Sequence, residues 1–185
     1  MSFLLTGCGS RKLNKNMAQD LIANLPGDVL DQEDFDVEGI SQIGSSNAVI
    51  QTKLNAAFRF QKVRGKWIPR EVRIGNDQWE DIDDLVATLR RIKEDRTRGL
   101  LDTVAEAIEK YCVENGALPR FGDYDSLSDA LAPEYLNPLI RLDAWERPLH
   151  VDQLNANTVR LLSGGADGKL WSGDDIELIR TYTSK

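Results

Sequence analysis

The feature that most constrains the fold is a long stretch of helical periodicity between residues 82 and 115. Apolar residues recur there every three or four positions, and the spacing resumes at Leu100 after a charged stretch. Gly116 follows as a typical C-terminal cap. One helix over this range would be about 50 Å long, and a break near Gly99 is the alternative. The stripe consists of Ile82, Leu85, Val86, Leu89, Ile92, Leu100, Leu101, Val104, Ile108, Tyr111 and Cys112.

Before this helix, most of the sequence has the two-residue period of β-strands. Residues 17–25 have helical spacing and end at a Pro-Gly pair, whereas three later runs have the alternation of strands. The turn Arg64-Gly65 separates the second run from the third, so the runs predict an antiparallel meander with a helix across its apolar side. Pro69 indicates an edge strand or a β-bulge. The runs are FDVEGISQIG, NAVIQTKLNAAFRFQKV and KWIPREVRI.

We therefore predict a small α+β domain over residues 17–80. Its order of a helix and then a meander containing FRFQKVRGKWIPREV resembles the cystatin-like and NTF2-like folds, which serve many unrelated activities. A polar cavity in this domain would favour an enzyme or a ligand-binding protein, and an exposed strand would favour an interaction module. No nucleophile–base pair or metal-ligand cluster is present in this range, so we expect no enzyme. The acidic run Asp77, Glu80, Asp81, Asp83 and Asp84 is typical of a helix start.

Composition excludes several classes of function. The 185 residues include 30 Asp+Glu and 23 Lys+Arg, for a net charge of −7, whereas a protein that follows phosphate backbones needs a basic face. We therefore expect no nucleic-acid partner. No apolar run approaches the length of a membrane-spanning helix. Two cysteines make no disulfide framework; Cys112 is typical of a small core residue, and the single histidine, His150, of an ordinary partly buried one.

The N-terminal sequence Leu5-Thr6-Gly7-Cys8 resembles the lipobox of bacterial lipoproteins. A polar stretch, GSRKLNKN, follows it as a tether would. Only a short apolar segment precedes it, whereas a secretory signal has about 7–15 apolar residues. The resemblance implies that Cys8 carries lipid, that residues 1–16 are a signal remnant and tether, and that the chain is anchored on the periplasmic side of the bacterial envelope. A chance match in a tail is the alternative.

The segment SGGADGKLWSGDDIELIR places Asp167, Asp174 and Asp175 in a glycine-rich stretch between two hydrophobic strand-like runs. Like charges this close repel, so the segment is either a solvated turn or a site for a cation. Calcium takes about 6–8 oxygen ligands, and glycines let the backbone turn its carbonyls inward. An EF-hand is excluded because Ser172 stands where that motif needs glycine, and its last position has no glutamate.

Four motifs follow one another between residues 100 and 180. They are AEAIEKYCVENGALPRF, SLSDAL, LIRLDAWERPLHV and RLLSGGADGKLWSGDDIEL. This order resembles the soluble domain of the major, G-type pseudopilin of type II secretion. The resemblance implies a pilin-like fold over residues 81–185, with a long helix, a small antiparallel sheet and a calcium loop. It also implies one calcium ion held by the side chains of Asp167, Asp174 and Asp175 and by backbone carbonyls near Gly164 and Ser172.

The sequence also departs from this family. Ala144 replaces the family's proline and Glu146 its glycine, while Trp145 between them is expected to be a core anchor. Pseudopilins begin with about 20 apolar residues that form the filament core, and here a different domain stands in that place. We therefore expect a pseudopilin-like domain reused on another protein. It would be a non-enzymatic envelope protein whose partners are secretion or pilus-like proteins. An interaction or ligand-binding lipoprotein that uses the N-terminal domain is the alternative.

Overall fold

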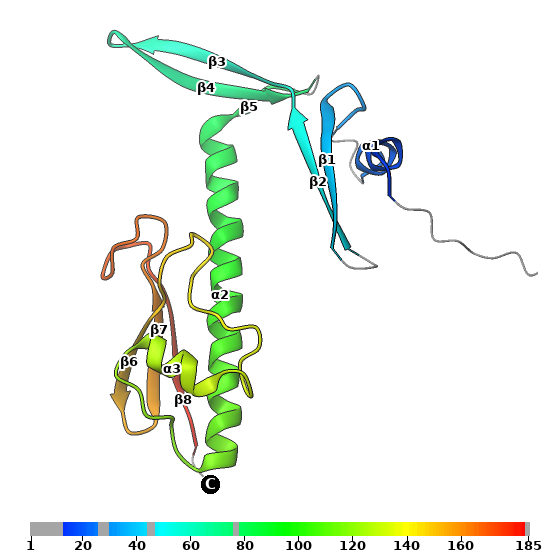
Figure 1. Cartoon of the computed structure of the whole chain (residues 1–185). Coiled ribbons are helices and arrows are strands. Elements are labelled where there is room, and N and C mark those ends of the chain that lie inside the picture. Colours follow the sequence, from blue (N-terminus) through cyan, green and yellow to red (C-terminus); the bar gives the residue numbers. More distant parts are fainter. Residues whose placement is uncertain (1–12, 26–29, 44–46, 76–77, 184–185) are drawn as a thin grey trace, which may run out of the picture. The chain divides into compact units, whose positions relative to one another are not determined.

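The computed structural model describes residues 13–25, 30–43, 47–75 and 78–183 (Figure 1). The fold is α+β, with helices and antiparallel sheets, as the sequence predicts. The chain divides into two compact units, Met1–Leu85 and Val86–Lys185, which are described separately below. Cys8, the predicted lipidation site, lies outside the described residues.

The first unit begins with α1 (Lys15–Ala23). The Asn14 side chain caps this helix by accepting a hydrogen bond from the backbone N–H of Met17 at 3.0 Å. The strands β1 (Phe35–Ile43) and β2 (Asn47–Leu54) form an antiparallel hairpin beside it (Figure 1). Ala18 of α1 is fully buried in a small cluster with Phe35 and Val37 of β1, so the helix covers one side of this hairpin.

The strands β3 (Ala56–Val63) and β4 (Lys66–Ile74) form a second hairpin, to which the short β5 (Glu80–Asp81) adds an edge. Arg64 and Gly65 form its turn with φ values of 48° and 81°, as a tight hairpin turn requires. The pairing register shifts opposite Pro69, between Arg59 and Phe60. The sequence leaves an edge strand or a bulge open at Pro69, and the structure has a bulge at this position, because proline cannot donate to the ladder.

The three strand-like runs form two hairpins in separate sheets, and not the one continuous meander that the sequence predicts. The long second run is divided at Asn55. The backbone N–H of Asn55 donates to the Asp34 carbonyl at 2.8 Å, and its carbonyl accepts from the Gly75 N–H at 2.6 Å. Because both backbone groups of Asn55 bond to other segments, β2 ends before Asn55 and β3 begins after it.

The helix α2 (Ile82–Asn115) begins in the first unit with its first turn, and the rest of it organises the second unit; it is a single helix without a break at Gly99. The Asp81 carboxylate accepts a hydrogen bond from the backbone N–H of Asp83 at 2.7 Å, so the acidic run caps the helix as expected; Asp77 lies outside the described residues. Gly116 ends the helix at a φ of 72°. The C-terminal part of α2 buries Thr97, Leu101, Val104, Ala105, Ala107, Ile108 and Cys112.

A three-stranded antiparallel sheet and a short helix complete this unit. The strands β6 (His150–Asn155), β7 (Thr158–Ser163) and β8 (Ile176–Thr181) pair in that order. Figure 1 shows the sheet and α3 (Tyr124–Leu131) beside the C-terminal half of α2. Their apolar side chains form one core with the α2 stripe.

The structure confirms the predicted burial of three residues of this unit and contradicts that of a fourth. Tyr111 and Trp145 are partly buried and pack against the core, as predicted, and Tyr111 makes an edge-on contact with Tyr135 at 5.4 Å between ring centroids. Cys112 is a buried core residue, as predicted. His150 differs from the expectation, since it is exposed at the start of β6. None of the described helices has the length and apolar character to cross a membrane.

Candidate functional site

The aspartate loop, residues 164–175, connects the adjacent antiparallel strands β7 and β8. Ser163 pairs with Ile176 at its base, which brings the two ends of the loop together. The approach is close: a Cβ added to Gly165 would lie 2.0 Å from the carbonyl oxygen of Asp174. Gly165 has a φ of 56°, so this position requires glycine for both its conformation and its contacts.

Ser172 connects two of the three aspartates. Its hydroxyl donates to Asp174 Oδ1 at 2.5 Å and lies 3.3 Å from Asp167 Oδ1. The other Asp174 oxygen accepts from the backbone N–H of Asp167 at 2.9 Å, and Asp167 Oδ1 accepts from the backbone N–H of Lys169 at 2.8 Å. The structure therefore brings the side chains of Asp167, Asp174 and Ser172 together.

Asp175 has a different environment from the other two aspartates. Its Oδ2 accepts a hydrogen bond from the backbone N–H of Trp171 at 2.7 Å. Its Oδ1 is buried, and no group in the described part of the chain donates a hydrogen bond to it. A buried acceptor without a donor costs about 1–3 kcal/mol, so it calls for a specific explanation. A cation would satisfy this oxygen.

The hydrogen bonds of the loop also affect its charge. The Ser172 hydroxyl, and after it the backbone N–H of Asp167, lower the pKa of Asp174 below its ordinary value. These donors stabilise the ionised carboxylate. The Asp174 carboxylate therefore stays charged at neutral and mildly acidic pH, and its stabilising bonds are lost only when the pH falls through this lowered pKa.

A buried network holds the base of the loop in place. Asp143 is 4% exposed, and its Oδ2 accepts from the Ser163 hydroxyl at 2.6 Å. Its Oδ1 accepts from the backbone N–H groups of Trp145 at 2.8 Å and Arg147 at 3.0 Å. Arg147 Nη1 then donates to the Gly165 carbonyl at 2.8 Å. The segment that resembles the family's tryptophan motif is thus bonded directly to the aspartate loop.

Sequence reasoning did not identify Asp143, Arg147 and Ser163 as part of the site. Buried Thr97 of α2 also belongs to this network, because its hydroxyl oxygen accepts from the backbone N–H of Ala144 at 3.1 Å. An aspartate that accepts from backbone N–H groups two and four residues later is a recognised turn pattern, and this signal was available at Asp143. The bond between Asp143 and Ser163 spans 20 residues and has no local signal.

The oxygen atoms of the loop suit the binding of a hard cation. Its side-chain ligands are carboxylate and hydroxyl oxygens, which suit calcium better than softer metals. The Gly164 carbonyl accepts from the Gly168 N–H at 2.8 Å and keeps a second lone pair for another interaction. Across the described ranges, no three side chains of His, Cys, Asp or Glu converge as a complete metal-binding group. The loop in this conformation therefore has the chemistry for calcium without a fully converged set of carboxylates.

The first unit contains a polar cavity that bears on the enzyme alternative. A hollow of about 290 Å³ is lined by Asp34, Asn55 and Arg73 together with Glu33, Ala56, Ala57 and Gly75. Arg73 Nε is buried and has no hydrogen-bond acceptor among the residues that the structure describes, and the Arg73 guanidinium lies over the Trp79 ring. The described lining has no serine, cysteine or histidine nucleophile, so its chemistry suits the binding of a small polar ligand.

Comparisons of this chain with family models, curated proteins and solved structures found no match. The pseudopilin resemblance therefore depends on the order of the motifs and on the chemistry of the aspartate loop.

Proposed function

We propose that this chain is a non-enzymatic protein of the bacterial cell envelope whose C-terminal unit is a pseudopilin-like domain stabilised by one calcium ion. It would act in type II secretion or in a similar pilus-like assembly. The observation that carries the proposal is the buried Asp175 Oδ1, which lies in a loop rich in carboxylate and carbonyl oxygens and accepts no hydrogen bond from the described residues. The order of the long helix, the short helix and the sheet with its acidic loop adds support.

In this proposal calcium supplies only positive charge. The side chains of Asp167, Asp174 and Asp175, with carbonyls near Gly164 and Ser172, would hold the ion, and it would offset the repulsion between the carboxylates. The chain's own contribution is to hold the base of the loop: the β7–β8 pairing joins its two ends, and the Asp143 network bonds to Ser163 and Gly165 at the end next to β7. A loop fixed in this way presents its oxygens with little loss of conformational entropy.

A second candidate function has its own observation in support. The 290 Å³ cavity that contains Asp34 and Arg73 favours an interaction or ligand-binding lipoprotein that uses the N-terminal unit. A small ligand with both a positive and a negative group would match these two side chains. The two candidates make different predictions for calcium, because the cavity lies in the other unit from the aspartate loop.

Proteolysis at Lys169 tests the calcium proposal. Lys169 is exposed within the aspartate loop, and a protease cuts such a site only when the loop opens. At a free calcium concentration about ten times the dissociation constant, cleavage after Lys169 by endoproteinase Lys-C should become about tenfold slower. Mass spectrometry of the fragments over time measures this rate. Cleavage after Lys66, at the β3–β4 turn, is the internal control, and a calcium effect of equal size at both lysines would contradict the proposal.

The envelope location makes a separate prediction about Cys8. Protein isolated from bacterial membranes should begin at Cys8 and carry acyl mass, because the preceding residues resemble a lipobox. Stable anchoring takes more than one lipid chain, so we expect the mass of several acyl groups. Intact-mass spectrometry makes the measurement, with a Cys8→Ser chain as the control. An unmodified chain that retains Met1 would show that the lipobox match is accidental.

A further inference from the structure

The β3–β4 hairpin is strongly basic within an acidic chain. Residues 56–75 contain six basic residues and one acidic residue, whereas the whole chain has a net charge of −7. Arg59 forms an ion pair with Glu71, and Arg59 and Arg73 both lie over the ring of Trp79. No ion pair within the described residues involves the other four basic side chains of the hairpin. These four are Lys62, Arg64, Lys66 and Arg70.

The same hairpin exposes large aromatic side chains on one face. Phe58 and Phe60 alternate along β3, and Trp67 of β4 shares their face because it is paired with Lys62. Phe58 is 56% exposed, Phe60 53% and Trp67 67%. Lys62 lies over the Trp67 ring at 5.7 Å. Aromatic groups of this size on one exposed face mark an interaction surface.

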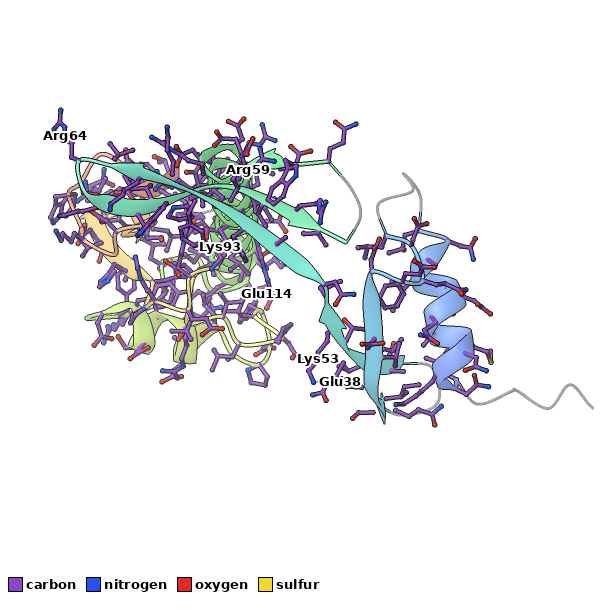
Figure 2. The ribbon with its side chains drawn as sticks, turned by 90° about the horizontal axis from the view of Figure 1, so that it is seen from above. Glu38, Lys53, Arg59, Arg64, Lys93 and Glu114 are labelled. Carbon is purple, nitrogen blue, oxygen red and sulfur yellow. The ribbon has the colours of Figure 1, made fainter. Side chains whose placement is uncertain are left out.

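The cations lie at the hairpin tip and along the opposite face. Lys62, Arg64 and Lys66 surround the turn, and Figure 2 shows the Arg64 side chain directed away from the ribbon at this tip. Arg70 donates to Gln61 on the face opposite the phenylalanines. The hairpin is therefore amphipathic, with aromatic rings on one side and positive charge at its tip and on the other side.

We propose that this hairpin docks on an anionic lipid bilayer. Amphipathic elements with aromatic rings on one face and lysine or arginine on the other lie in the headgroup region, where the cations contact phosphates. Tryptophan favours the same region because its ring is apolar and its N–H is polar. The basic hairpin is complementary in charge to an anionic partner, whereas the rest of the chain is acidic and would repel one.

A bilayer fits the apolar face better than a single-stranded nucleic acid does. Nucleic acid would use the aromatic rings for stacking, but Pro69 and Ile74 on the same face provide no aromatic ring for it. Both add apolar area that a bilayer would cover. The proposal requires neither Cys8 nor the aspartate loop, so its failure would leave the proposed function untouched.

The experiment uses the full chain with Cys8→Ser, which cannot be acylated. It measures co-sedimentation with vesicles of equal parts phosphatidylglycerol and phosphatidylcholine, and with vesicles of phosphatidylcholine alone. We expect binding only to the anionic vesicles, and weaker binding at high salt. Each basic side chain at such a surface contributes about fivefold, so Lys62→Gln with Lys66→Gln should lower partitioning roughly 25-fold. Trp67→Ala should weaken it as well.

Matched variants control for net charge and for exposed aromatic area. Lys110→Gln with Lys169→Gln removes the same charge from exposed sites in the other unit, and Trp171→Ala removes an indole that is 65% exposed. Both should leave partitioning unchanged. Failure to bind anionic vesicles, or equal losses in the hairpin and control variants, would overturn the proposal. Tighter binding to oligothymidylate than to vesicles would also overturn the proposal, provided that the hairpin variants abolish the oligothymidylate binding.

Discussion

Replacement of Asp143 by alanine should lower the free energy of unfolding of the second unit by about 3 kcal/mol. Asp143 is 4% exposed and accepts from the Ser163 hydroxyl and from the backbone N–H groups of Trp145 and Arg147. Alanine would leave these donors without an acceptor in a buried place, at about 1–3 kcal/mol for each unsatisfied group. Alanine also removes the free-energy cost of burying the Asp143 carboxylate, which offsets part of this loss.

Urea denaturation of the wild type and the variant measures this loss. Asp95→Ala is the matched control, because Asp95 is exposed on α2 and its one ion pair within the described residues is with Arg98, so its loss should change stability by less than about 0.5 kcal/mol. The Asp143 variant should also bind calcium more weakly, since the loop base would lose its support at Ser163. A stability change below about 1 kcal/mol would mean that the network does not hold the loop base.

Calcium should raise the thermal stability of the wild-type chain. At a free concentration 100 times the dissociation constant, ligand linkage stabilises the folded state by about 2.7 kcal/mol. For a unit of the size of Val86–Lys185, where each kcal/mol shifts the melting temperature by about 4–8 °C, this corresponds to a rise of about 11–22 °C. Magnesium should do less, because it requires a tight octahedron and loses water reluctantly.

Asp174→Ala should abolish the calcium-dependent rise. The substitution removes one proposed ligand of the ion and the acceptor that holds the Ser172 hydroxyl and the Asp167 N–H. Asp95→Ala, which removes the same charge away from the loop, should keep the full rise. Thermal melts with chelator, calcium or magnesium make the comparison. A rise that survives Asp174→Ala would place the calcium somewhere other than the aspartate loop.

Much of the fold could be predicted from the sequence because several signals are local. The α2 stripe repeats over residues 82–115, so periodicity predicts helix over this range, with a break near Gly99 left open as the alternative, and Gly116 marks the helix end. The Arg64-Gly65 turn and the bulge at Pro69 follow from backbone chemistry at those residues. The separation of the two hairpins could not be predicted, because it depends on backbone bonds from Asn55 to the distant Asp34 and Gly75.

Part of the candidate site could likewise be predicted from local sequence, and part of it could not. The aspartates are close in sequence, so their shared loop could be predicted, whereas the buried position of Asp175 Oδ1 depends on the folded loop. The support for the loop comes from Asp143 and Thr97, which are far from it along the chain. Their contribution is tertiary, and no pattern around either residue indicates the partner that it meets.

Calorimetric titration tests most directly whether the aspartate loop is a calcium site. Calcium should bind the wild-type chain with a stoichiometry of one, and magnesium should bind more weakly. Asp175→Asn should remove the binding, because it replaces the charged Oδ1 that lacks a donor with a neutral group of similar shape. Asp95→Asn should bind as the wild type does. Absence of calcium binding by the wild type, or equal binding by the wild type and Asp175→Asn, would contradict the proposal.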